Sequence, residues 1–148
     1  MTQLTWLEEQ RAKKEQEGTQ YKILLPLIFE TLNKLNVKEF SFIYEGSGDS
    51  GCFESIAITY KNDKTDRRSY YNKWKDDIPN FMTLNDFSYS LQEIMAAIAE
   101  WLLETNYSGW ENNEGGRGEV VFLTDTETVS LEHTEFIITE HNYTVEFN

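Results

Sequence analysis

The stretch FSFIYEGSGDSGCFESIAITY, residues 40–60, decides the fold. Aromatic and branched side chains alternate in it with smaller or polar ones, at Phe40, Phe42, Tyr44, Ile56, Ile58 and Tyr60. A period of two is typical of a β-strand that buries one face. Because the glycine-rich run Gly46–Gly51 joins the two alternating segments, the stretch predicts a β-hairpin, and residues 67–71 are a candidate third strand.

Helical periodicity dominates the residues that precede the hairpin. Residues 3–17 predict a polar helix, and Gly18 is a candidate break after it. Apolar side chains then recur at spacings of three and four over residues 21–35, which predicts an amphipathic helix with Pro26 at its first turn or at a kink.

A second amphipathic helix is predicted in the middle of the chain. Thr83 and Asp86 resemble a capping box, which marks a helix start. The apolar face that follows consists of Phe87, Leu91, Ile94, Met95, Ile98 and Leu102. We expect this helix to end near Thr105.

Alternating segments at 120–124, 129–133 and 136–147 predict the last strands, after a loop over residues 106–118. Consecutive runs of strands indicate an α+β fold rather than alternating βαβ units. We therefore expect an antiparallel sheet of about five to six strands, with N-terminal helices and one long central helix packed on one face. We expect residues 1–148 to form a single domain, with a polar helix at 1–18 that can be peripheral and an α+β core at 19–148.

Charge is distributed very unevenly along the chain. The net charge is −13, and residues 76–148 contain 15 acidic residues against one base, Arg117, whereas residues 1–75 are nearly balanced. An acidic surface of this kind repels nucleic-acid phosphates and anionic lipid. It favours a basic partner protein or a divalent cation, although acidic surfaces also serve solubility alone.

Two loops rich in glycine and in oxygen-bearing side chains are the candidate binding site. The candidate residues are Asp49, Ser50, Glu54, Trp110, Glu111, Asn112, Asn113, Glu114, Arg117 and Glu119. Asn, Asp, Ser and Gly are also ordinary turn residues, so loop chemistry alone is the competing interpretation. No set of residues with a catalytic pattern emerges, and we lean against an enzyme.

Some of the same residues, with both histidines, are candidate ligands for a divalent or transition metal: Asp49, Glu54, Glu111, Glu114, His133 and His141. The two histidines face one another if residues 129–145 form a hairpin. The preferred interpretation of His133 is a residue at the edge of the core with a hydrogen-bond partner, since it continues the face of Val129 and Leu131. No cofactor is otherwise predicted.

Two motifs resemble those of a known family. The first is FIYEGSGDSG at residues 42–51 with FESI at 53–56, and the second combines WLLE at 101–104, GWENNEGGRGE at 109–119 and VSLEH at 129–133. Together they resemble DUF6878, a domain of unknown function of bacteria and their phages, over residues 35–148. The resemblance implies a fold and a prokaryotic or phage source, and it implies no activity.

The sequence thus favours a small acidic protein-interaction module. We expect a phage or mobile-element accessory or inhibitor protein, a nucleic-acid mimic that engages a basic, nucleic-acid-handling partner through its acidic C-terminal half, in the cytoplasm of a bacterium or an infected host. Direct contact with nucleic acid or with anionic lipid is not expected because the acidic half repels phosphates, and a membrane span is not expected since no run approaches about 18 apolar residues. A metal-binding domain or metal-dependent enzyme built on the two loops, and a small-ligand-binding protein, stay open as alternatives, as does the oligomeric state.

Overall fold

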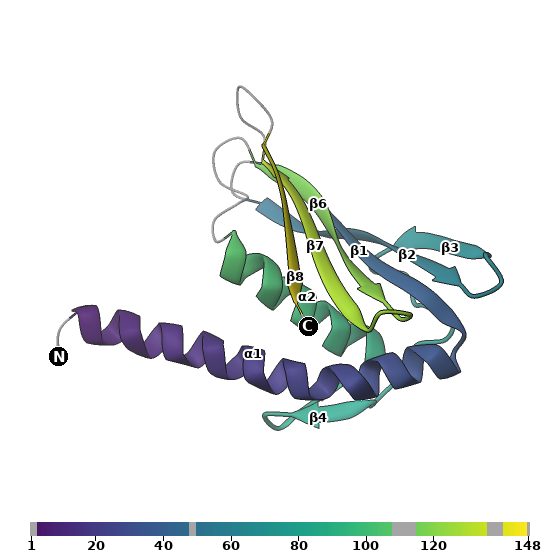
Figure 1. Ribbon diagram of the computed structural model, residues 1–148, viewed down its shortest axis with the longest axis horizontal. Coiled ribbons are helices and arrows are strands. Elements are labelled where there is room, and N and C mark those ends of the chain that lie inside the picture. Colours follow the sequence, from purple (N-terminus) through teal and green to yellow (C-terminus); the bar gives the residue numbers. More distant parts are fainter. Residues whose placement is uncertain (1–2, 48–49, 108–114, 136–140, 148) are drawn as a thin grey trace.

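A computed structural model describes residues 3–47, 50–107, 115–135 and 141–147. Six antiparallel strands form one sheet, in the order β3-β2-β1-β6-β7-β8, and the helices α1 and α2 lie on the same side of it (Figure 1). The elements are α1 (Gln3–Lys34), β1 (Val37–Ser47), β2 (Ser50–Tyr60), β3 (Thr65–Ser69), β4 (Met82–Leu84), β5 (Phe87–Tyr89), α2 (Leu91–Asn106), β6 (Gly116–Leu123), β7 (Thr128–Glu135) and β8 (His141–Phe147). The predicted α+β class and the number of strands are confirmed.

One helix replaces the two that the sequence predicts before the hairpin. α1 continues through Gly18 and Pro26, so the predicted break and the plural N-terminal helices are wrong. An interior glycine costs a helix about 1 kcal/mol and an interior proline about 3 kcal/mol. Burial offsets that cost, since Ile28, Phe29 and Leu32 are almost fully buried and each buried side chain of this size contributes about 1.5–3 kcal/mol.

The predicted hairpin forms the centre of the sheet. β1 and β2 pair from Val37↔Tyr60 to Ser47↔Ser50, which places Phe42 opposite Ile56. A register irregularity between Ile43 and Tyr44 bends the pair, as a β-bulge does. β1 also pairs with β6, so the hairpin lies between β3 and the C-terminal strands.

The segment before α2 is a small hairpin and not the start of the helix. β4 and β5 pair around Asn85 and Asp86, which both have positive φ, and Phe87 is 66% exposed instead of facing the core. The capping box is at Ser90 and Glu93: the Ser90 hydroxyl accepts from the Glu93 N–H at 3.1 Å, and the Glu93 carboxylate accepts from the Ser90 N–H at 2.8 Å. This reciprocal pair caps the helix at Ser90, seven residues after Thr83, the N-cap that the sequence predicts.

The three C-terminal strands form an antiparallel meander. β6 pairs with β7 and β7 with β8, as the alternation predicts, while residues 136–140 lie outside the described part of the chain. The core is the layer between these strands and the helices, where Phe122, Leu131 and Ile98 are fully buried. In the residues that the structure describes, no helix is both long and apolar enough to cross a membrane.

Candidate functional site

The face of the sheet that points away from α1 and α2 carries most of the charged strand residues. Since side chains alternate between the two faces of a strand, neighbours of buried residues point to this side. We call it the open face, and its members are Glu39, Ser41, Ile43, Glu45, Ser55, Ala57, Arg67, Arg117, Glu119, Val121, Ser130, Glu132, Thr134, Asn142, Thr144 and Glu146. Among the described elements, neither helix covers it (Figure 1).

A shallow hollow of about 540 Å³ lies on the open face, with lining residues from all six strands of the sheet. Its charged lining consists of four carboxylates and two guanidinium groups, those of Glu45, Glu54, Glu119, Glu132, Arg67 and Arg117. Glu54, Arg117 and Glu119 are residues that the sequence predicts as binding residues. The structure therefore brings these three predicted residues together in one place.

Glu119 and Glu132 are directly opposite one another on β6 and β7. The pKa of Glu119 is raised, first because the carboxyl is partly buried and then because the charges of Glu132 and Glu39 oppose its ionisation, while Arg67 acts in the other direction. Like charges that are directly opposite across strands cost about 0.2–1 kcal/mol. A positively charged group placed between them would remove this cost, so the pair has the electrostatics of a cation-accepting site.

Glu132 and Arg67, which line this hollow, and Glu39, whose charge acts on Glu119, are not identified from the sequence. Each of these residues is a charged residue within a strand segment of alternating polar and apolar residues, and each occupies one of the polar positions. The alternation predicts the face of each strand. It does not predict which residues of different strands become neighbours, because that depends on the register.

His133 lies on the opposite side of the sheet, in the core. Its exposed fraction is 1%, its Nδ1 is 2.6 Å from the Tyr44 hydroxyl, and the ring stacks on Tyr107 with 4.3 Å between centroids. The core-edge interpretation with a hydrogen-bond partner is thus confirmed. The two histidines do not face one another, because His133 pairs with Tyr143 and His141 pairs with Glu135.

The other predicted site residues fall on parts of the chain that are not described. Asp49, Trp110, Glu111, Asn112, Asn113 and Glu114 lie outside the described residues, and for Ser50 and His141 only the strand backbone is described. Among the described residues, no group of three or more His, Cys, Asp or Glu side chains is placed to hold a metal ion. The metal site at the two loops stays a prediction.

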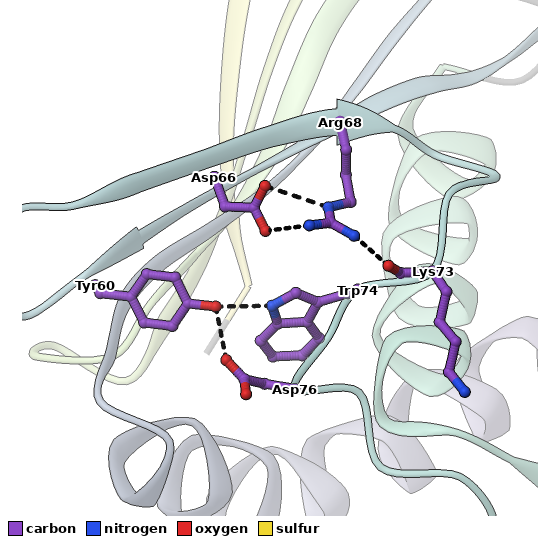
Figure 2. A network of polar contacts seen from close by, with 6 residues as sticks. All are labelled: Tyr60, Asp66, Arg68, Lys73, Trp74 and Asp76. Carbon is purple, nitrogen blue, oxygen red and sulfur yellow. Dashed lines mark hydrogen bonds and ion pairs between the residues drawn. The ribbon is translucent and has the colours of Figure 1, made fainter.

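A second hollow, of about 880 Å³, lies at the other end of the sheet beside Tyr60. Figure 2 shows the polar contacts of this region. The Trp74 Nε1–H donates to the Tyr60 hydroxyl at 2.9 Å, and that hydroxyl donates to Asp76 at 2.8 Å. Arg68 donates to both oxygens of Asp66 and to the Lys73 carbonyl. These groups satisfy one another, so the network fastens the segment that carries the fully buried Trp74 onto β2 and β3.

Residues 25–147 match the family described as "Family of unknown function (DUF6878)". The chain belongs to this family. The DUF6878 match includes the whole sheet and α2, and it begins inside α1, so that residues 1–24 precede it. No curated protein and no solved structure matches the chain.

Proposed function

We propose that this chain is a small acidic protein-interaction module that docks the open face of its sheet on a basic surface of a partner protein. The observation that carries the proposal is the Glu119–Glu132 pair, two carboxylates directly opposite one another across β6 and β7, an arrangement that is expected to cost stability. Unfavourable local arrangements of charge are found at binding and catalytic sites, because a bound ligand relieves the repulsion.

The shape of the open face also suits a protein partner. Small side chains occupy much of one row across its middle, at Ala57, Ser41 and Ser130, and a partner's long side chains can approach the partly exposed Ala57 and Ser130. An arginine is the best complement of the pair, because its planar guanidinium donates to two carboxylate oxygens at once. Docking of an arginine would lower the pKa of Glu119.

The charge of the chain indicates what the partner surface normally holds. A net charge of −13, concentrated in residues 76–148, opposes contact with nucleic acid and attracts surfaces that bind nucleic acid. The proposal is therefore an accessory or inhibitor protein of a phage or mobile element, acting in the host cytoplasm on a basic, nucleic-acid-handling protein.

The test is capture of partners from a bacterial lysate with the full chain, followed by elution with sodium chloride from about 0.05 M to about 0.5 M. The wild type is compared with Glu119→Gln/Glu132→Gln and with a control that loses the same charge elsewhere, Glu100→Gln/Glu127→Gln. Glu100 and Glu127 are exposed and lie on α2 and on the turn between β6 and β7.

We expect a basic partner that elutes with salt, is retained by the control and is lost by the open-face variant. Exposed charge pairs weaken as salt shortens the Debye length, so elution by salt is the signature of this contact. A partner that resists salt, or one that the open-face variant and the control retain equally, would contradict the proposal.

A further inference from the structure

A groove runs between the N-terminal half of α1 and the end of α2, on the helix side of the sheet. It measures about 700 Å³, and its floor and rim include Leu7, Arg11, Lys14, Lys22, Trp101 and Phe147. We call it the α1 groove. Ligand pockets in proteins measure about 300–1,000 Å³, so the α1 groove is large enough for the apolar side chains of a peptide.

The floor of the α1 groove is fixed by contacts inside the protein. The Trp101 indole N–H donates to the Lys14 carbonyl at 3.1 Å, and the ring packs on Phe147 with 5.2 Å between centroids. Gly18 lets the indole approach the helix, since a Cβ there would lie 2.6 Å from a ring carbon of Trp101. A floor that is already ordered loses little conformational entropy when a ligand binds.

The rim of the α1 groove is basic in a chain that is strongly acidic. Arg11, Lys14 and Lys22 line it together with a single acid, Glu15. The Lys22 ammonium lies 5.3 Å from the centre of the Phe147 ring, so a positive charge stands directly at the apolar floor. The Debye length is about 8 Å at physiological salt, so charges farther than this from the groove are largely screened.

We propose that the α1 groove binds a short acidic amphipathic helix of a partner protein. Two helices form the sides of the groove, and a third can place its apolar stripe between them in the manner of helix-in-groove recognition. The apolar stripe contacts Leu7, Trp101 and Phe147, and carboxylates beside it pair with Arg11, Lys14 and Lys22.

The α1 groove and the open face are independent sites. The helices lie on the covered side of the sheet, and the wall formed by Leu7 to Lys22 precedes the residues that match the family. The floor residues Trp101 and Phe147 lie within the matched residues, so the α1 groove combines one wall that precedes the match with a floor that belongs to it.

The test is a titration of the full chain with a synthetic helical peptide that has leucines at a helical spacing and glutamates at all other positions. Fluorescence anisotropy of the labelled peptide measures binding at about 0.15 M salt. The control peptide has lysines in place of the glutamates. Leu7 and Leu27 provide matched variants, since both are on α1, with exposed fractions of 49% and 47%, and only Leu7 lines the α1 groove.

We expect saturable binding of the acidic peptide that Leu7→Ala weakens by about tenfold, because about 1.4 kcal/mol of buried apolar contact is lost. Leu27→Ala leaves it unchanged. Arg11→Glu weakens binding by about fivefold, while Lys13→Glu, the same charge reversal at a position outside the groove lining, changes it less than about twofold.

Four results would overturn the proposal: no saturable binding, equal binding of the lysine peptide, equal effects of the two leucine variants, and a concentration-dependent dimer that excludes the peptide. The last result would assign the α1 groove to a second copy of the chain. Circular dichroism of each variant shows whether it is folded before it is titrated.

Discussion

Replacing Glu119 with glutamine should make the protein more stable. The change keeps the size of the side chain and removes one of two charges that are opposite across β6 and β7. Such a pair costs about 0.2–1 kcal/mol, and water partly screens it because Glu119 is only partly buried. We expect the free energy of unfolding at pH 7 to rise by about 0.5 kcal/mol, and the melting temperature by about 1–2 °C.

The increase in the free energy of unfolding that Glu119→Gln produces should depend on pH in a defined direction. The folded-state pKa of Glu119 lies above its ordinary value of 4.5. The stability contributed by the protonated carboxyl is therefore fully present below pH 4.5 and is lost as the pH rises through the raised pKa. The advantage of Glu119→Gln over the wild type should be greatest at pH 7 and should vanish below pH 4.5.

Urea denaturation followed by tryptophan fluorescence measures these differences. Glu146→Gln is the matched control, because Glu146 is on the same face but opposite Ser130 and not another carboxylate. In a double-mutant cycle, Glu119→Gln and Glu132→Gln should together gain less than the sum of the two single changes. Destabilisation by Glu119→Gln at pH 7, or an advantage that grows as the pH falls, would refute the reasoning.

Three further changes test the packing that supports the two sites. Gly18→Ala should destabilise the protein by about 1–3 kcal/mol in urea denaturation, although alanine normally favours a helix, because the new Cβ would lie 2.6 Å from Trp101. Tyr60→Phe should cost about 1–3 kcal/mol in thermal denaturation, since the buried Trp74 N–H loses its acceptor. Burial raises the pKa of Tyr60 to about 12, so the wild type should lose stability as the pH rises from 10 towards 12, and the variant should lose less. Ser90→Ala should cost about 1 kcal/mol and reduce helical circular dichroism, because α2 loses its cap.

The hairpin and the central part of α2 could be predicted from the sequence, because the spacing of their apolar residues is regular and uninterrupted. Gly18 shows where local signals mislead: glycine usually breaks a helix, but here it admits the ring of Trp101, which is 83 positions later in the sequence. The predicted start of α2 at Thr83 is wrong for a similar reason. Asn85 and Asp86 form a turn with positive φ, and the helix is capped by Ser90 and Glu93 instead.

The candidate site could be predicted only in part. Glu54, Arg117 and Glu119 stand out in the sequence because they flank glycine-rich segments. The partner of Glu119 could not be identified, because only the register of β6 against β7 places Glu132 opposite it. His133 could be assigned to the core because it alternates along the strand with Val129 and Leu131 and therefore points to the same face.

Methyl NMR of the chain titrated with a short polyarginine peptide tests the central claim most directly. Neighbouring residues report on the two faces, since Val121 lies on the open face and Val120 is fully buried beneath it. The account predicts that the methyl signals of Val121 and Ile43 shift and saturate, that those of Val120 and Ile56 do not move, and that Glu119→Gln/Glu132→Gln abolishes the shifts. Signals that move equally on both faces, or shifts that persist in the variant, would contradict it.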